Sequence, residues 1–378
     1  MYLCVIQNGL IMNQQYQPIM KNLLIIFCLF LLSCSQVKDI IKVEYALSSG
    51  VELLSSSVFE DIEVIQLPGK AFPTWSRLVA KNGLYYISGE DEKVHLFDAS
   101  GNYLNSVGEV GRGPGEYTSF NGLTIEDNGD ISIYSSTGIL YTYSSQGCFL
   151  GSTEYPVSSP EFAKANGFNY HYFGNGGGHA YQLYIGDKQN YIIDSCLAAI
   201  NAIALQLGSV FSEYGNALNL CLPDDGDIYR LIDGKADLSY TFDFGVYNLS
   251  SAYYRSSNMD ETFAYIYSSA NAFKCKFLEN QSHAILEACV FDGPQEMDRI
   301  LYCILDKATS IWKWYYMNDG DFMDFYNLKY MDDSYLYFIA YPDTMTDANI
   351  AARFPALGAL SEDCATVILK CKLATGDK

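Results

Sequence analysis

The sequence is poor in basic residues and in histidine. Its 378 residues include 23 Lys and Arg against 44 Asp and Glu, a net charge of −21, and four His. Nucleic-acid binding needs clustered basic residues, and adsorption to anionic lipid headgroups does too, so the composition argues against both. Charged residues make up only 18% of the chain, whereas Tyr and Phe number 32 and 21 and Gly 30. This composition favours strands joined by turns over amphipathic helices, and we predict an all-β protein.

Familiar catalytic signatures are missing as well. The chain has no GxSxG, HExxH or GK[ST] motif, which argues against α/β-hydrolase, zincin and P-loop chemistry. The eight cysteines that follow residue 34 form no CxxC pair and show no spacing typical of a zinc site. Some of them, such as Cys289 and Cys303, lie in apolar strand-like runs. Because cysteine packs there as a small hydrophobic residue, we expect unpaired core thiols rather than disulfides.

The chain also lacks an apolar run long enough to cross a bilayer near its amino end. The run Leu23–Leu32 has ten residues, whereas a spanning helix needs about 20. Lys21 precedes this run, and Ser33 and Cys34 follow it. This order is the layout of a bacterial lipoprotein signal, with Cys34 as the lipidated residue. The alternatives are a plain signal peptide with an incidental cysteine, or a short buried helix.

The signal divides the chain into three parts. We predict a signal peptide over residues 1–33, with translation starting at Met20, just ahead of the positive charge. A polar tether anchored at Cys34 then covers residues 34–58, and the folded domain covers residues 59–378. The expected location is the outer membrane, with the domain facing the periplasm or the cell surface.

Short strand-like segments separated by turns fill the folded domain. Ile62–Leu67 alternates apolar and polar residues, and Leu84–Ile87 follows an Asn-Gly turn. Val94–Asp98 leads through an Asp-x-x-Gly turn into Tyr103–Val107, which predicts a hairpin. The same pattern recurs, more loosely toward the carboxyl end. The further segments are Ile131–Tyr134, Leu140–Tyr143, Cys148–Leu150, Leu218–Leu222, Asp227–Leu231, Leu238–Phe242, Thr262–Tyr267, Phe273–Phe277, Ala284–Phe291, Ile300–Leu305, Phe325–Tyr330, Tyr335–Tyr341 and Ala365–Leu373.

Units of three or four strands that recur roughly every 45–60 residues are typical of propeller blades. We therefore predict a six-bladed β-propeller with four-stranded antiparallel blades. A ring of this kind must close, and we expect the amino-terminal strand, residues 59–67, to complete the last blade beside residues 365–373. The Ala-rich stretch Ile185–Gly208 fits this pattern poorly. We interpret it as an irregular blade edge or an insertion, with a short helix as the alternative.

Two sequence patterns resemble a known family. In the first, Val94–Asp98 is followed by the GRGPGEY segment Gly111–Tyr117; in the second, Asp227–Leu231 is followed by Tyr240–Gly245. With the lipoprotein signal, these patterns resemble the six-bladed β-propeller lipoproteins common in gut-dwelling Gram-negative anaerobes, distant relatives of NHL-repeat propellers. The resemblance covers most of residues 20–250. It implies a fold and a location, and no particular reaction.

The loop Gly111–Tyr117 is the first candidate site. Its three glycines around one proline allow backbone conformations that bring the chain close to another surface. The interpretation that we favour is a crossing between two blades, pinned by Arg112 or Glu116. The functional alternative places Arg112, Glu116 and Tyr117 at the mouth of the central channel, where propellers generally bind ligands.

Acidic loops and aromatic clusters are the other candidates. Pro223–Asp227 and Asn318–Asp321 offer carboxylates that suit calcium, but neither has the spacing of an EF-hand, and Asp-Gly is ordinary turn chemistry. Trp312–Tyr316 and Tyr253–Arg255 offer ring faces on which sugars could stack. Packing between strands is the simpler explanation for these aromatics.

Taken together, the sequence predicts a monomeric binding or scaffold module attached to the membrane by its lipid. A protein or a carbohydrate is the expected partner, nucleic acid is not, and no cofactor is expected beyond a calcium ion at most. The competing class is a metal-dependent, lactonase-like hydrolase with carboxylates at the central channel. An enzyme of that class would gather several Asp, Glu, Asn or His side chains around a bound divalent metal.

Overall fold

A computed structural model describes most of the chain from residue 41 onward. The predicted signal peptide, Cys34 and the acidic loop Asn318–Asp321 lie outside the described residues. The described residues are 41–44, 51–52, 58–73, 75–175, 178–200, 208–256, 258–293, 297–317, 327–341, 360 and 363–374.

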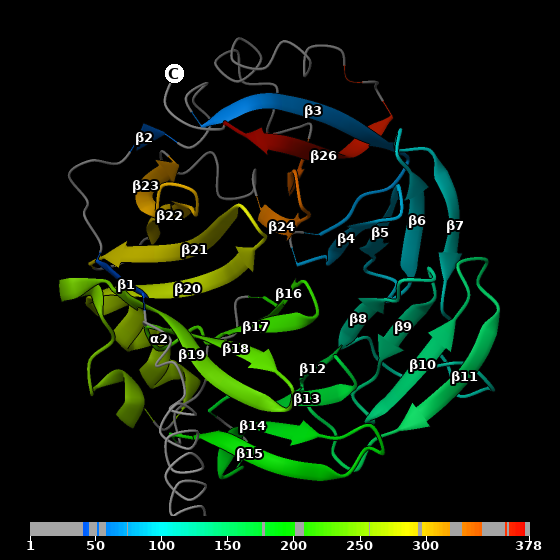
Figure 1. The fold of residues 1–378 in the computed structure, drawn as a ribbon, viewed down its shortest axis with the longest axis horizontal. Helices are drawn as coiled ribbons and strands as arrows, with labels where there is room; N and C mark the ends of the chain where they lie inside the picture. The colour runs from blue at the N-terminus through cyan, green and yellow to red at the C-terminus, as the bar shows by residue number, and fades with distance from the viewer. Residues whose placement is uncertain are drawn as a thin grey trace, which may run out of the picture. The chain divides into compact units, whose positions relative to one another are not determined.

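The strands form six antiparallel sheets arranged around a centre, as Figure 1 shows, so the predicted six-bladed β-propeller is confirmed. Each blade uses four consecutive strands, apart from the last. Blade 1 consists of β4 (Leu78–Lys81), β5 (Leu84–Ser88), β6 (Val94–Asp98) and β7 (Tyr103–Val107). Blade 2 consists of β8 (Gly122–Ile125), β9 (Ile131–Tyr134), β10 (Ile139–Tyr143) and β11 (Phe149–Glu154). Blade 3 consists of β12 (Glu161–Ala165), β13 (Phe168–Tyr172), β14 (Tyr181–Gly186) and β15 (Ile192–Ala198).

The remaining blades follow the same order from the inner strand outward. Blade 4 consists of β16 (Phe211–Tyr214), β17 (Ala217–Cys221), β18 (Asp227–Ile232) and β19 (Lys235–Asp243). Blade 5 consists of β20 (Ala270–Glu279), β21 (His283–Asp292), β22 (Met297–Asp306) and β23 (Ile311–Met317). Blade 6 combines β24 (Asn327–Met331), β25 (Leu336–Ala340) and β26 (Cys364–Leu373) with β3 (Phe59–Pro68).

Blade 6 closes the ring with strands from opposite ends of the chain. β3 pairs antiparallel with β26, with Ile65 opposite Ile368 and Leu67 opposite Thr366. Figure 1 shows this pair along one edge of the ring, blue beside red. The predicted closure by the amino-terminal strand is therefore confirmed.

Apolar side chains of neighbouring blades pack against each other and hold the ring together. Tyr86 and Leu96 of blade 1 form one buried cluster with Ile131 and Ile133 of blade 2. Because both faces of a middle strand are covered in this way, all four residues of β9 are buried. The outermost strand β11 has no buried residue. This gradient explains why the alternation in the sequence is blurred in the middle strands.

Two short strands extend the ring beyond the predicted pattern. β1 (Ile41–Glu44) pairs parallel with β19, and β2 (Val51–Glu52) pairs parallel with β23, so blades 4 and 5 have five strands each. Both strands come from the segment expected to be a tether. Val43 is buried in the apolar cluster between blades 4 and 5.

One predicted strand is wrong. Residues 262–267 belong to the helix α2 (Met259–Ser268), in the connection from blade 4 to blade 5. The Asn258 side chain accepts a hydrogen bond from the Glu261 amide and caps this helix, and the spacing Thr262 to Ile266 buries one of its faces. Two 3-10 helices, η2 (Gly245–Tyr247) and η3 (Tyr253–Arg255), precede it. The Ala-rich stretch contributes β15, the outer edge of blade 3, as expected of a blade edge.

Candidate functional site in the central channel

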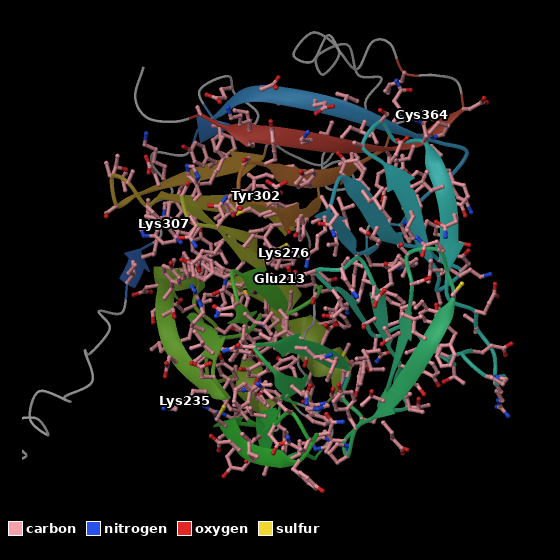
Figure 2. All side chains as sticks on the ribbon, turned by 45° about the vertical axis from the view of Figure 1, so that its right-hand side comes forward. Glu213, Lys235, Lys276, Tyr302, Lys307 and Cys364 are labelled. Atoms are coloured by element: carbon pink, nitrogen blue, oxygen red, sulfur yellow. The ribbon has the colours of Figure 1, made fainter. Side chains whose placement is uncertain are left out.

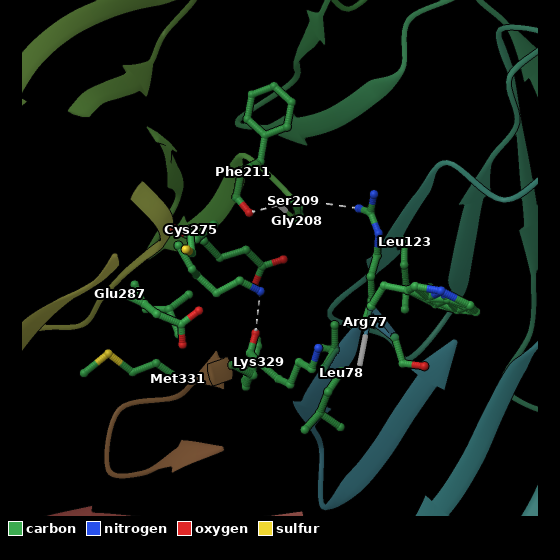
Figure 3. Close-up of a pocket in the computed structure, with 18 of the residues that line it drawn as sticks. Arg77, Leu78, Leu123, Gly208, Ser209, Phe211, Cys275, Glu287, Lys329 and Met331 are labelled. Atoms are coloured by element: carbon green, nitrogen blue, oxygen red, sulfur yellow. Dashed lines mark hydrogen bonds between the residues drawn. The ribbon is translucent and has the colours of Figure 1, made fainter. Parts of the chain in front are cut away.

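A cavity of about 630 Å³ occupies the central channel, and each of the six innermost strands contributes to its wall. A volume of this size suits a small molecule. Its lining alternates charged groups with apolar ones such as Leu78, Leu123 and Met331 (Figure 3). The charged groups fall into four sets: the Arg77–Glu161 ion pair, the two lysines with Glu287, Glu213, and Glu279, which is ion-paired with Arg230 and Lys307.

Arg77 connects four blades across the first part of this wall. Its Nη2 donates to Glu161 Oε1 at 2.6 Å and to the carbonyl oxygen of Asn121 at 2.6 Å. Ser209 Oγ donates to Glu161 Oε2 at 3.2 Å, and Figure 3 marks its further contact with Arg77. Glu161 is only 5% exposed, and such a buried carboxylate is stable only while its cation stays in place. We conclude that this ion pair is part of the framework of the channel.

Lys276 and Lys329 lie next to each other on the strands β20 and β24. The Lys276 ammonium donates to the carbonyl oxygen of Lys329 at 3.4 Å, an interaction drawn in Figure 3. Burial lowers the pKa of both lysines. For Lys329 the positive charge of Lys276 adds to this effect, and its pKa falls to about 7. The channel thus contains two amines whose charges repel each other in a poorly hydrated place.

Glu287 is the acidic partner of this lysine pair. It stands opposite Lys276 in the β20–β21 register, and its Oε2 accepts the Leu328 amide at 3.2 Å. Burial raises the pKa of Glu287, and the charge of Lys276 works against that rise. One buried carboxyl therefore lies beside two amines.

Glu213, on β16, brings a carboxylate to another part of the same cavity. Figure 2 shows Glu213 and Lys276 near the middle of the ring. The Glu213 side chain is exposed to the channel but is surrounded by protein on its other sides. The loss of surrounding water raises the pKa of Glu213. Lys81 acts in the opposite direction and lowers it.

The predicted loop Gly111–Tyr117 connects blade 1 to blade 2 and holds itself in shape. Glu116 Oε2 accepts the Gly113 amide at 2.7 Å, and the buried Tyr117 hydroxyl donates to the Glu92 carbonyl oxygen. Arg112 is exposed. These contacts agree with the interpretation as a pinned crossing, with Glu116 as the residue that pins it. The residues that line the channel cavity are others, and a ligand role of Arg112, Glu116 and Tyr117 stays a prediction.

The acidic loop Pro223–Asp227 has its own internal cation. Lys274 Nζ lies 3.2 Å from Asp225 Oδ1 and 2.7 Å from the Asp227 carbonyl oxygen, and its side chain is fully buried. Burial raises the pKa of Asp224 and of Asp225. The Lys274 ammonium therefore interacts with the same acidic loop that the sequence suggested as a calcium site. In the part of the chain that the structure describes, no three His, Cys, Asp or Glu side chains form a group that could hold a metal ion.

The aromatic candidates pack inside the blades. Trp312 meets Tyr240 edge to face at 5.8 Å between ring centroids, and Trp314 meets Phe244 at 6.1 Å. Tyr253 is completely buried. Their rings stabilise the interface of blades 4 and 5 and the connection between them, as the simpler explanation had it.

Sequence reasoning missed the charged residues of the channel. Arg77, Glu161, Lys276 and Lys329 are single charged residues within or beside short apolar strands, a pattern that also fits an exposed strand face. The alternation Lys274-Cys275-Lys276 inside an otherwise buried strand was the available signal. It could identify the channel only once β20 was known to be the innermost strand of its blade.

Fold and cavity together define a six-bladed β-propeller with a charged central channel. The chain belongs to the family described as domain of unknown function DUF4934, which it matches over residues 38–369. No curated protein matches the sequence.

Two solved structures are similar to the chain at low sequence identity. A Bacteroides fragilis protein assigned as exported is 15% identical, with a TM-score of 0.71, and the match covers 89% of this chain and 100% of that one. A protein of unknown function from Bacteroides caccae is 11% identical with a TM-score of 0.37, covering 63% and 79% of the two chains. The first likeness supports the propeller fold. None of the described helices has the length and apolar character to cross a membrane.

Proposed function

We propose that this protein is an envelope lipoprotein whose propeller binds a small anionic molecule in its central channel. The observation that carries the proposal is the pair Lys276 and Lys329, which face one cavity with Glu287 as their shared carboxyl. The ligand would carry a carboxylate or a phosphate, the groups that ammonium ions bind best. The neutral and apolar parts of the lining, Leu78, Leu123 and Met331, suit the remainder of such a molecule.

Charge supports an anion over a cation at this position. The Arg77–Glu161 pair is internally neutral, so two amines and one carboxyl remain at the lysine pair. A bound anion would offset the repulsion between the amines and restore the proton that burial removes from Lys329. Glu213 and Glu279 also line the cavity, and Glu279 is ion-paired with Arg230 and Lys307, so the excess of amines is confined to the lysine pair.

Titration calorimetry on the purified protein tests this proposal with a panel of small carboxylates and phosphates. Lys276→Gln and Lys329→Gln each remove a charge-assisted hydrogen bond worth about 1.5–3 kcal/mol, so affinity should fall roughly 10- to 100-fold. Lys235→Gln is the matched control, because Lys235 is exposed on β19 at the outer side of its blade (Figure 2). Binding that survives both channel substitutions, or no binding across the panel, would contradict the proposal.

The envelope location rests on the sequence signal that ends at Cys34, with the exported Bacteroides fragilis protein as a structural neighbour. Metabolic labelling with a tagged fatty acid should mark the wild-type protein and leave Cys34→Ala unmarked. Mass spectrometry of the mature protein should find a lipid-modified Cys34 as its first residue. Protease treatment of intact cells then determines whether the propeller faces the periplasm or the outside.

A further inference from the structure

Two cysteines meet in the wall of the channel. Cys275 Sγ on β20 lies 2.9 Å from Cys289 Sγ on the neighbouring strand β21. Both residues are half-buried, and Cys275 lines the cavity, as Figure 3 shows. All eight cysteines among the described residues are thiols, and no other two sulfur atoms of this set are in contact.

The strand register explains this contact. Lys274 and Lys276 pair with the consecutive residues Ala288 and Glu287, so Cys275 is the extra residue of a β-bulge. Neighbouring residues of a strand point to opposite faces, and Cys289 therefore shares a face with Glu287. Cys275 lies two residues from Phe273, the partner of Cys289, so it is on that face too. The contact is thus built into the backbone of blade 5 and does not depend on a chance rotamer.

From this geometry we propose that Cys275 and Cys289 are a reversible disulfide pair in the channel wall. A small or protein-bound disulfide is the oxidant. The thiolate of Cys275 attacks one oxidant sulfur to form a mixed disulfide, and Cys289 then displaces the second sulfur. One S–S bond forms in the protein and one breaks in the oxidant, which leaves with two electrons and two protons as two thiols. Because Cys275 faces the cavity, a small disulfide reaches it through the channel.

The surroundings make this pair selective. Cys303 and Cys371 are fully buried, and burial raises the pKa of both thiols. The hydrogen bond with Cys289 and burial raise the pKa of Cys275 as well, so the selectivity comes from access through the cavity and from the second sulfur beside it. Cys148 is exposed but has no second sulfur beside it. An oxidant should therefore cross-link Cys275 to Cys289 before it links any other pair.

Thiol trapping and mass spectrometry test the proposal on the full mature protein. The folded protein is incubated with oxidised glutathione, its remaining thiols are alkylated, and its peptides are analysed. A single linked peptide pair containing Cys275 and Cys289 is expected, lighter by two hydrogens and reversed by dithiothreitol. Cys148→Ser should form the same link, whereas Cys275→Ser and Cys289→Ser should not. The oxidised protein should also melt a few degrees higher than the reduced one, because the link restricts the conformations of the unfolded chain.

The proposal is overturned if both thiols of the folded protein stay open to alkylation while the urea-unfolded protein oxidises. A scatter of links among several cysteines in the folded state would overturn it equally. The readout is covalent, so it stands apart from ligand binding in the channel. Failure here leaves the proposed anion site untouched, and the reverse also holds.

Discussion

Lys274 and Lys276 are two residues apart in β20, but their side chains lie in different environments. The bulge at Cys275 turns Lys274 toward Asp225, where its ammonium balances an acidic loop, and turns Lys276 into the channel. A regular strand would put both on one face. A single extra residue in the backbone thus gives the channel its second amine.

The low pKa of Lys329 makes a prediction about anion binding. The free folded protein loses the Lys329 proton as the pH rises through about 7, whereas a bound anion favours the protonated amine. Anion affinity should therefore be constant below pH 7 and fall above it, by at most about tenfold per pH unit. Calorimetry between pH 6 and pH 9 measures this slope. Lys329→Gln should flatten it, and an equal slope in the variant would refute the assignment.

The same lysine affects stability in a defined direction. The unfolded chain keeps the Lys329 proton up to about pH 10.4, while the folded protein loses it near 7, so the unfolded state binds more protons between these values. The contribution of Lys329 to the free energy of unfolding therefore increases as the pH rises from about 7 to about 10.4.

Breaking the Arg77–Glu161 ion pair by a single substitution should strongly lower the free energy of unfolding. Glu161→Ala leaves the Arg77 guanidinium facing the channel without its carboxylate, and the free energy of unfolding should fall by about 3 kcal/mol. Urea denaturation measures this. Glu154→Ala, at an exposed position of β11, is the control and should change little. The double substitution Arg77→Met with Glu161→Leu should lower the free energy of unfolding less than Glu161→Ala does. An equal or larger decrease would contradict the role of the ion pair.

At the scale of elements, the Gly111–Tyr117 loop shows how one side chain can set a crossing between blades. Glu116 supplies the acceptor for the Gly113 amide, and Gly115 takes a φ of +77° beside the Phe149 ring. A side chain at Gly115 would be strained in that conformation and would have no room.

Removal of the Glu116 side chain and removal of the Arg112 side chain should affect the stability of the protein differently. Glu116→Ala should lower the free energy of unfolding by about 1–2 kcal/mol, because the Gly113 amide loses its acceptor. Arg112→Ala should stay within about 0.5 kcal/mol, because Arg112 is exposed. Chemical denaturation gives both values. Calorimetry on the same variants should find unchanged anion binding, and weaker binding in Arg112→Ala would instead favour the channel-mouth interpretation.

The strands were predictable where hairpin turns separate apolar runs, as from Leu84 to Val107, because turn chemistry and alternation are local properties. Helix α2 was not predicted, since its aromatic residues suit either a helix or a strand. Its capping residues Asn258 and Glu261 were the sign that decides between the two. The channel site depends on which residues from six blades converge, so Lys276 and Lys329 could not be paired from sequence alone.

At the scale of the whole molecule, the pairing of β3 with β26 makes the ring depend on both chain ends. A protein that begins at residue 69 lacks β3 and leaves blade 6 with three strands, so its cooperative unfolding transition should be lost. Of the described strands, a protein that begins at residue 53 lacks β1 and β2, and it should keep that transition. Calorimetric melting of the two truncated proteins checks this. A sharp transition in the shorter one would show that the ring does not need its closing strand.

The added strands β1 and β2 have a consequence for handling the protein. They cover the outer edges of blades 4 and 5, where β19 and β23 would otherwise present unpaired backbone amides and carbonyls. Open edges of this kind recruit strands from other molecules. A shortened protein that starts after residue 52 should therefore fold and yet self-associate at high concentration. Expression work on this family should keep the chain from residue 41 onward, or place a proline or a lysine on the uncovered edge.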